Sequence, residues 1–354
     1  MSIAPTFEED LALGSLTLSN GESLQNVIQR VSIYGTPRED HANLVFVSHG
    51  LTASGRLPEW WEGFVGPGLA LDTDRLALLG INVLGGCYGS TGPASLSSDG
   101  TPYGSRFPVL SIGDMVAAQQ AALAKLGIGR MRGVIGGSVG AMLGLQWILR
   151  EPERFRHGII IGASDFFSPM AIALNALSRA AIIHDPHFAG GDYYDGPPPN
   201  EGVHLARMIA MVTYKSAALF DARFGRRPDR AGADLAQDPR ARFDIEGYLE
   251  YQGRKFVARM DANTYLTLTR AMDLYDLRAE RTAATETSLT FVGIDSDWLF
   301  PADEIRQAAE RFRLRGFPVR FQTLHSDHGH DAFLTDLPEL AALIGPALEG
   351  FYVD

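Results

Sequence analysis

The sequence is poor in cysteine and in long apolar runs. Cys87 is the only cysteine among 354 residues, which excludes an intrachain disulfide and argues against a cysteine-based zinc site. No 18 apolar residues follow one another, so no transmembrane helix and no membrane partner are expected. The first twenty residues are acidic and lack the basic start and apolar run of a signal peptide. These absences predict a cytoplasmic protein.

Dense clusters of basic residues are also missing. The chain has 31 Lys and Arg against 42 Asp and Glu, a net charge of −11. A protein that binds nucleic acid needs a basic face, so no nucleic-acid partner is expected. Apolar residues make up 45% and charged residues 21%, which indicates a folded globular chain rather than a disordered one. At roughly 150 residues per domain, the length suits two domains or one core with a large insertion.

Short apolar runs rich in β-branched residues recur along the chain. Such runs, bounded by glycine, are typical of strands buried on both faces of a parallel sheet. They occur at 44–48, 76–83, 131–135, 158–162, 289–293 and 319–324. Helical spacing of apolar residues lies between them, at 112–126, 140–149 and 302–313. This alternation predicts an α/β fold with a mostly parallel central sheet and helices on both faces.

The alternation stops over residues 166–284. That stretch contains helical patterns and no buried-strand run, with helices expected at 166–183, 203–224, 245–260 and 262–275. We interpret it as a helical lid inserted between two strands. The core of the fold then consists of residues 1–165 and 285–354.

A candidate nucleophile lies in the glycine-rich turn GGSVG at 136–140. Small residues two positions before and after Ser138 allow a tight turn from the strand at 131–135 into the following helix. The hydroxyl then stands exposed at the end of the sheet, and the N–H of Val139 can help to bind an oxyanion. The alternative is a glycine-rich turn with an idle serine.

A nucleophilic serine needs a base and a carboxylate, which in this type of fold follow it in the order Ser, Asp or Glu, His. The loop after the strand at 289–293 contains two carboxylates, and the loop after 319–324 contains three histidines. The candidates are Asp295, Asp297, His325, His328 and His330. Spacing alone does not choose among them. The histidine-rich loop also suggests a metal site, but the chain has no HExxH pair, and we expect no metal.

The loop after the first of these strands reads His49-Gly50-Leu51-Thr52. In this fold the loop supplies a second oxyanion donor, and the N–H of Leu51 is the candidate. A plain strand-to-helix turn explains the same residues equally well.

Long strings of residues resemble the homoserine O-acetyltransferases of the α/β-hydrolase fold. The resemblance extends over most of the chain, and its strings are far more specific than GxSxG. The strings include WWEGFVGPGLALDTDR at 60–75, NVLGGCYGSTGP at 82–93, PYGSRFPVLSIGDMVAAQ at 102–119, GGSVGAMLGLQW at 136–147, GGDYY at 190–194, ARMIAMVTYKS at 206–216, FDIEGYLEYQGRKFVARMDANTYLTLTRAMD at 243–273, SDWLFP and GHDAF.

The resemblance implies roles for particular residues. It implies a catalytic triad of Ser138, Asp297 and His330. It also implies a substrate site made of Arg207, Tyr214, Asp331 and Thr52. In that site Arg207 would bind the homoserine carboxylate and Asp331 would lie near the amine, with Tyr214 beside the carboxylate; a guanidinium suits a carboxylate and an aspartate suits an ammonium.

The reaction implied is transfer of an acetyl group from acetyl-CoA to the hydroxyl of L-homoserine, through an acyl-serine and with ping-pong kinetics, in methionine biosynthesis. No bound cofactor is implied, since acetyl-CoA is a co-substrate, and the family is commonly homodimeric. Three alternatives stay open. The first is the same chemistry with another donor or acceptor, such as succinyl-CoA, serine or another alcohol. The second is an esterase or amidase, and the third is a catalytically silent binding or scaffold protein.

The chain departs from the family pattern around the nucleophile. Val139 stands where Met is usual, Ala141 where Gly is usual, and Met211 where His is common. The loop HGLTASGRLP also differs from the usual HALTG form. These departures bear on the identity of donor and acceptor more than on the fold or the triad.

Overall fold

The computed structural model describes residues 3–232, 234–282 and 285–352. Its strands are β1 (Phe7–Thr17), β2 (Ser23–Tyr34), β3 (Leu44–Ser48), β4 (Val65–Gly66), β5 (Leu71–Asp72), β6 (Ala77–Ile81), β7 (Met131–Gly137), β8 (Phe155–Ile161), β9 (Ser288–Ile294) and β10 (Val319–Leu324). Its α-helices are α1 (Ile112–Lys125), α2 (Val139–Arg150), α3 (Pro169–Ile183), α4 (Asn200–Tyr214), α5 (Ala217–Arg223), α6 (Asp244–Val257), α7 (Ala262–Asp273), α8 (Ala302–Leu314), α9 (Ala332–Thr335) and α10 (Leu337–Tyr352).

Eight strands form one sheet in the order β1-β2-β6-β3-β7-β8-β9-β10. The strands from β6 to β10 pair in parallel, whereas β2 runs antiparallel to both β1 and β6. The predicted fold class, a mostly parallel sheet in an α/β-hydrolase arrangement, is confirmed. No helix in the described ranges is both long and apolar enough to cross a membrane.

The sheet separates two apolar cores, because successive side chains of a strand point to opposite faces. Phe46 packs in the core that also holds buried residues of α1, α2 and α8. Its neighbours Val45 and Val47 pack in the other core, together with buried residues of α10 and of the segment 57–71. Burial on both faces explains why these strands read as continuous apolar runs.

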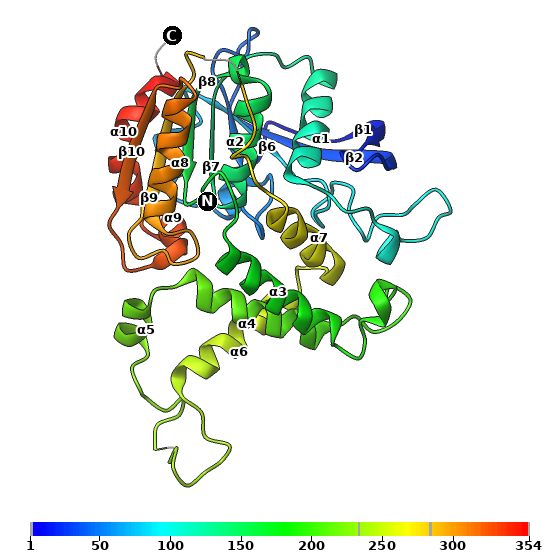
Figure 1. Ribbon diagram of the computed structural model, residues 1–354, viewed down its shortest axis with the longest axis vertical. Helices are drawn as coiled ribbons and strands as arrows, with labels where there is room; N and C mark the ends of the chain where they lie inside the picture. The colour runs from blue at the N-terminus through cyan, green and yellow to red at the C-terminus, as the bar shows by residue number, and fades with distance from the viewer. Residues whose placement is uncertain (1–2, 233, 283–284, 353–354) are drawn as a thin grey trace.

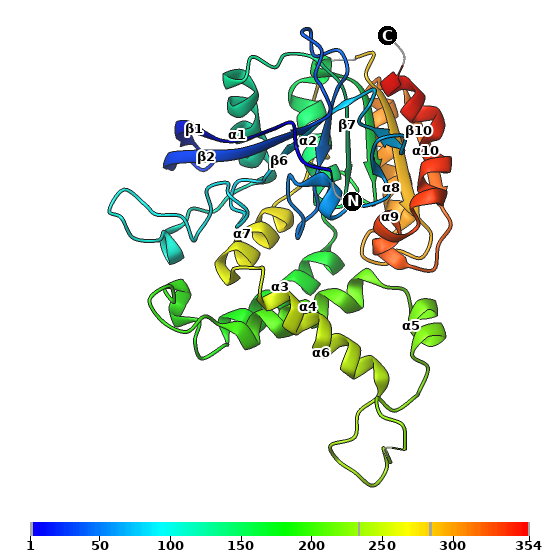
Figure 2. The same ribbon diagram turned by 180° about the vertical axis from the view of Figure 1, so that it is seen from behind.

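Helices α3 to α7 lie between β8 and β9 in the chain and stack beyond one end of the sheet (Figures 1 and 2). The chain leaves and re-enters the core side by side, since Phe167 N–H donates to Tyr275 O (3.1 Å) and Leu277 N–H to Asp165 O (2.7 Å). Residues after β3, β7 and β10 line one cavity with residues of α3 and α4. The inserted helices therefore cover the carboxyl ends of the parallel strands. The expected boundary at residue 284 lies outside the described residues.

Two helix predictions in this stretch are wrong in detail. The helix expected over 203–224 breaks at Lys215, whose backbone is extended (φ −119°, ψ 153°), and Ser216 then caps α5 by accepting the N–H of Leu219. The helix expected from residue 166 begins only at Pro169, because Ser168 caps its first turn and accepts the N–H of Ala171. In both places a serine cap decides where the helix starts.

The antiparallel hairpin of β1 and β2 was not predicted. Most side chains of β1 are exposed or partly exposed, so the strand has no continuous apolar run. It is held by its pairing with β2, which supplies the buried face of the hairpin through residues such as Val27 and Val31. Pairing between strands is a tertiary feature that a single apolar run does not report.

The start of α2 packs directly on the end of β3. A Cβ on Gly140 would lie 2.0 Å from Ser48 O, so no side chain fits there. We expect Gly140→Ala to lower the free energy of unfolding by about 1–3 kcal/mol through overpacking. Gly345→Ala on α10 is the control: a Cβ there meets nothing within 4 Å, and the better helix propensity of Ala should stabilise by about 0.5–1 kcal/mol. Urea unfolding measures both variants. Equal stability of Gly140→Ala and the natural protein would contradict this packing.

Candidate active site

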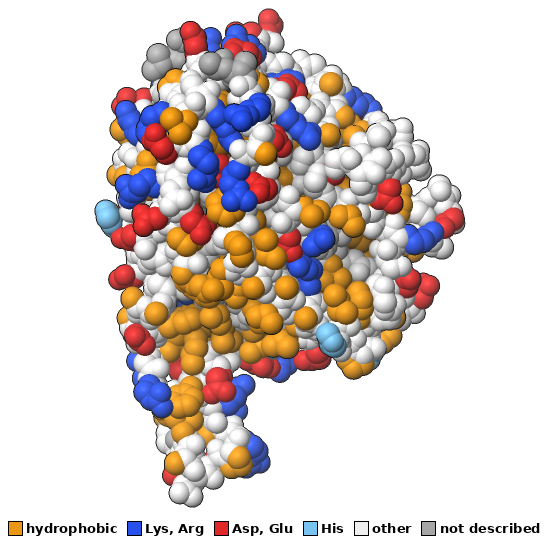
Figure 3. Space-filling model, viewed as in Figure 1, with side chains coloured by type: hydrophobic (Ala, Val, Ile, Leu, Met, Phe, Trp, Pro, Cys, Tyr) orange, Lys and Arg blue, Asp and Glu red, His pale blue; other side chains and the backbone are white. Residues whose placement is uncertain are grey.

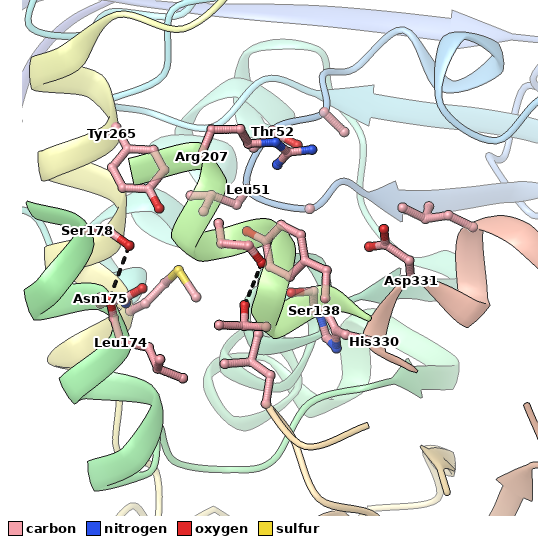
Figure 4. A pocket seen from close by; sticks show the side chains of 18 of the residues that line it. Leu51, Thr52, Ser138, Leu174, Asn175, Ser178, Arg207, Tyr265, His330 and Asp331 are labelled. Carbon is pink, nitrogen blue, oxygen red and sulfur yellow. Dashed lines mark hydrogen bonds between the residues drawn. The ribbon is translucent and has the colours of Figure 1, made fainter. Parts of the chain in front are cut away.

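Ser138 occupies a tight turn between β7 and α2. Its φ of 57° and ψ of −126° lie in a strained region for a side chain other than glycine. Its N–H donates to Ile161 O on the neighbouring strand (2.9 Å), which ties the turn to the sheet. The predicted strand-turn-helix context of this serine is present. Its side chain lines a cavity of about 290 Å³ at the carboxyl edge (Figure 4).

His330 and Asp297 form a buried pair beside this serine. His330 Nδ1 lies 2.6 Å from Asp297 Oδ2, and both residues are less than 5% exposed. The other oxygen of Asp297 accepts the N–H groups of Leu299 and Phe300, at 2.9 Å each. The carboxylate is therefore fixed on both sides, and it holds the ring with the proton on Nδ1. His330 Nε2 is buried and has no hydrogen-bond partner among the described residues.

Ser138 and His330 lie next to each other in the cavity (Figure 4). An imidazole held by a carboxylate through Nδ1 presents Nε2 as a proton acceptor, which is the arrangement that activates a serine hydroxyl. The three residues singled out by the family resemblance thus come together from three loops.

The rival residues lie elsewhere. His325 is paired with Asp295 (2.8 Å), and both side chains are largely exposed. His328 Nδ1 lies 2.6 Å from Asp336 Oδ1. None of these residues lines the cavity. Among the residues that the structure describes, no three His, Cys, Asp or Glu side chains are grouped to hold a metal.

The pKa of His330 is set by opposing effects. Burial lowers it, whereas the charge of Asp297 and the hydrogen bond to it raise it; Asp331 also raises it and Lys215 lowers it. The net result is a pKa above the ordinary value of 6.5. A neutral ring at neutral to basic pH is the form that accepts a proton.

The loop after β3 is braced by His49. This side chain is buried; its Nδ1 lies 2.9 Å from Gly50 O, and its Nε2 accepts the N–H of Val83 (3.2 Å). Burial lowers the pKa of His49 to about 4, so the ring stays neutral. The bracing positions Leu51 and Thr52, which both line the cavity. Val139 begins α2, where the first N–H groups have no acceptor within the helix.

The predicted substrate residues line the same cavity. Arg207 and Tyr214 come from α4, and Asp331 follows β10. The guanidinium of Arg207 lies over the rings of Phe256 (4.8 Å) and Tyr214 (5.4 Å). Its Nε is buried without a partner in the described chain. A half-buried guanidinium whose Nε has no partner can bind an anion that enters the cavity.

Lys215, which the sequence analysis missed, pairs with Asp331. Its Nζ lies 2.8 Å from Asp331 Oδ2, and the pair is mostly buried. At the same break between α4 and α5, Lys215 O accepts the indole N–H of Trp298 (3.1 Å), and Ser216 Oγ donates to Asp327 O. The inserted helices are thus bonded to both loops that carry Asp297 and His330. No sequence pattern links these residues, since they are far apart in the chain.

Comparisons with known proteins identify the family of this chain. Residues 43–337 match the family model described as the alpha/beta hydrolase fold. A homoserine O-acetyltransferase of Symbiobacterium thermophilum is 43% identical over 91% of this chain and 89% of its own length. One of Haemophilus influenzae is 38% identical over 95% of this chain and 96% of its own. The chain belongs to the homoserine O-acetyltransferase family. This is a family of acyltransferases built on the α/β-hydrolase fold.

Solved structures show the same fold at low sequence identity. The homoserine O-acetyltransferase of Bacillus anthracis superposes with a TM-score of 0.87 at 20% identity, with 99% of each chain covered. Esterase E22 superposes with a TM-score of 0.85 at 23% identity, over 98% of this chain and 99% of the other. The fold alone therefore does not separate transferase from esterase.

The residues at which this chain departs from the family pattern lie behind the cavity wall. Val139, Ala141 and Met211 are all buried, and none of them lines the cavity. In contrast, the altered loop contributes Gly50 to Ala53 directly to the lining. Residues of the altered loop can therefore touch a substrate, whereas the side chains of the three substituted residues do not line the cavity.

The buried pair predicts a pH dependence. Because the base must be neutral, kcat/KM for cleavage of p-nitrophenyl acetate should fall on the acid side with an apparent pKa above 6.5. Asp297→Asn removes the carboxylate charge that raises the pKa of His330, while the burial that lowers this pKa remains. The acid limb of the pH profile should therefore move to lower pH. The rate should fall by about 10³–10⁴-fold. Asp295→Asn, beside the exposed His325, should leave both quantities unchanged. An acid limb at the same pH in Asp297→Asn as in the natural protein would contradict the claim that Asp297 raises the pKa of His330.

Proposed function

We propose that the protein transfers an acetyl group from acetyl-CoA to the hydroxyl of L-homoserine through an acyl-serine. The observation that carries the proposal is the buried His330–Asp297 pair. The free Nε2 of His330 lies in one cavity with Ser138 and with Arg207, whose Nε also has no partner among the described residues. The names of the relatives support acetyl as the group transferred and homoserine as the acceptor.

In the first half-reaction His330 Nε2 takes the proton of Ser138 as Oγ attacks the thioester carbonyl. The N–H groups of Leu51 and Val139 stabilise the oxyanion, an effect worth about 10²–10³ in rate per donor in other enzymes. The C–S bond then breaks, and the CoA thiol leaves with the proton held by His330. An acetyl ester of Ser138 remains.

In the second half-reaction the acceptor hydroxyl gives its proton to His330 and attacks the ester carbonyl. The bond to Ser138 Oγ breaks, the serine regains the proton from His330, and the acetylated acceptor leaves. Arg207 binds the acceptor carboxylate, with Tyr214 and Thr52 beside it, and Asp331 receives the ammonium. Because Lys215 already pairs with Asp331, the Asp331 carboxylate would interact with two cations, Lys215 and the acceptor ammonium. Cover by the inserted helices limits access of water to the acyl-serine.

The test is release of CoA from acetyl-CoA with and without homoserine. We expect release to depend on homoserine, and Ser138→Ala to lower the rate by roughly 10⁴-fold or more, since triad residues act as a unit. Ping-pong kinetics should follow from the covalent intermediate. Equal release without homoserine identifies an ester or thioester hydrolase instead. Full activity of Ser138→Ala would contradict the covalent mechanism.

We further propose that the protein acts as a cytoplasmic homodimer in methionine biosynthesis. Large apolar side chains are exposed on the inserted helices, and Figure 3 shows hydrophobic side chains gathered over this part of the molecule. Met170 and Leu177 on α3 are 62% and 59% exposed, and Leu205 on α4 is 47% exposed. An apolar face of this kind is typical of a protein–protein interface.

Light scattering with size-exclusion chromatography tests the dimer. The natural protein should elute at twice the mass of one chain, and Leu177→Glu should shift it toward the monomer because a charge at a closed apolar interface is costly. Leu314→Glu is the matched control, since Leu314 is 79% exposed on α8 outside this face. A natural protein that is monomeric at micromolar concentration overturns the proposal.

A further inference from the structure

The cavity extends from Ser138 in two directions that differ in charge. Its charged lining residues, apart from His330, are Glu59, Arg207, Arg259 and Asp331, and none of them belongs to α3 or α7. The wall formed by α3 and α7 carries only uncharged side chains. We call this part the α3–α7 chamber; its residues are Leu174, Asn175, Ser178, Tyr265 and Met272.

The α3–α7 chamber and Asp331 lie on opposite sides of the nucleophile. Figure 4 shows Leu174, Asn175 and Ser178 on one side of Ser138 and Asp331 on the other, with Arg207 between these two regions. An acceptor bound between Arg207 and Asp331 leaves the chamber empty. The group on the other side of the carbonyl carbon, the acyl chain, is then the part of the substrate that faces the chamber.

Two polar side chains of the chamber donate hydrogen bonds within the inserted helices. Asn175 Nδ2 donates to Asp273 Oδ1 (3.0 Å) and Thr269 O (3.3 Å), and Ser178 Oγ donates to Leu174 O (3.1 Å). The hydroxyl of Tyr265 points toward Ser178 (Figure 4). Arg179, the cation next to Ser178 in the chain, does not line the cavity and is paired with Asp273 (2.5 Å). The chamber is therefore lined by uncharged side chains, and Asn175 and Ser178 use their donors within the inserted helices.

The cavity is also larger than an acetyl group requires. It measures about 290 Å³, on a scale on which one water molecule needs about 10–15 Å³. That volume includes the acceptor side as well as the chamber, and an acetyl group occupies only a small part of it. Each further methylene buried against Leu174 and Met272 should favour the transition state several-fold.

We propose that the α3–α7 chamber is an acyl-chain site that accepts straight, uncharged acyl groups of three or four carbons as well as acetyl, and rejects succinyl. The inference rests on the proposed acyl transfer. A succinyl carboxylate in the chamber meets no cationic side chain among the residues that line it, and burying it there is costly. If it instead turned to Arg207, it would occupy the receptor that the acceptor needs.

The experiment is a panel of acetyl-, propionyl-, butyryl- and succinyl-CoA with homoserine. For the natural protein we expect kcat/KM for propionyl- and butyryl-CoA within tenfold of that for acetyl-CoA, and at least 100-fold less for succinyl-CoA. Leu174→Trp fills the chamber and should lower the butyryl-to-acetyl ratio at least tenfold. Leu174→Ala enlarges it and should raise that ratio. Ala176→Trp adds the same indole at an exposed position of α3 and should leave the ratio unchanged.

Three outcomes overturn the acyl-chain site: succinyl-CoA used as well as butyryl-CoA, acetyl-CoA preferred 100-fold over propionyl-CoA by the natural protein, or a ratio that neither Leu174 variant changes. A second panel separates this site from the transferase proposal. Cleavage of p-nitrophenyl acetate, butyrate and hexanoate needs no homoserine and reports the acyl preference directly. One result would separate the two proposals: no acyl-CoA gives homoserine-dependent CoA release, but the Leu174 variants change the acyl preference in ester cleavage as expected. In that case the assignment of the acceptor is wrong and the assignment of the chamber as an acyl-chain site is supported.

Discussion

The contact between His330 Nδ1 and Asp297 Oδ2 depends on the register of two parallel strands. Strands β9 and β10 end level with each other, at the pair Ile294 and Leu324, so the loops that follow leave the sheet side by side. Inside the protein the carboxylate is stabilised by two backbone N–H groups and by the ring, and the ring is held in one tautomer by the carboxylate. Every chemical step proposed for Ser138 relies on this fixed orientation.

The inserted helices do more than cover the site. Their break at Lys215 and Ser216 is bonded to Asp331, Asp327 and Trp298, which lie in the two loops that hold the His–Asp pair. At the same time α3, α4 and α7 contribute nine of the residues that line the cavity. One segment therefore supports the geometry of the base and also sets the chemical character of the space around the nucleophile. Charged side chains line the part of the cavity where we propose that the acceptor binds. Uncharged side chains line the α3–α7 chamber, where we propose that the acyl chain lies.

Sequence reasoning succeeded where burial leaves a continuous pattern. Each of the six predicted parallel strands is present, because a strand buried on both faces must be apolar along its length. It failed where stability comes from pairing or capping. The exposed strand β1 has no such pattern, and the helix expected over 203–224 is interrupted by a capping serine that also satisfies a distant carbonyl. Local propensity cannot anticipate a bond to a residue in another part of the chain.

By itself, the sequence determined the order and type of the core elements, the turn that exposes Ser138, and, through its long family strings, which histidine and which aspartate to pair with it. Only the tertiary structure decided that Asp331 is shared with Lys215, that His49 braces the loop of Leu51, and that the space beside α3 and α7 is free of charge. The physical reason is that these features depend on distances between side chains from separate elements. Such distances are set only when the strands pair in register and the helices pack over the sheet.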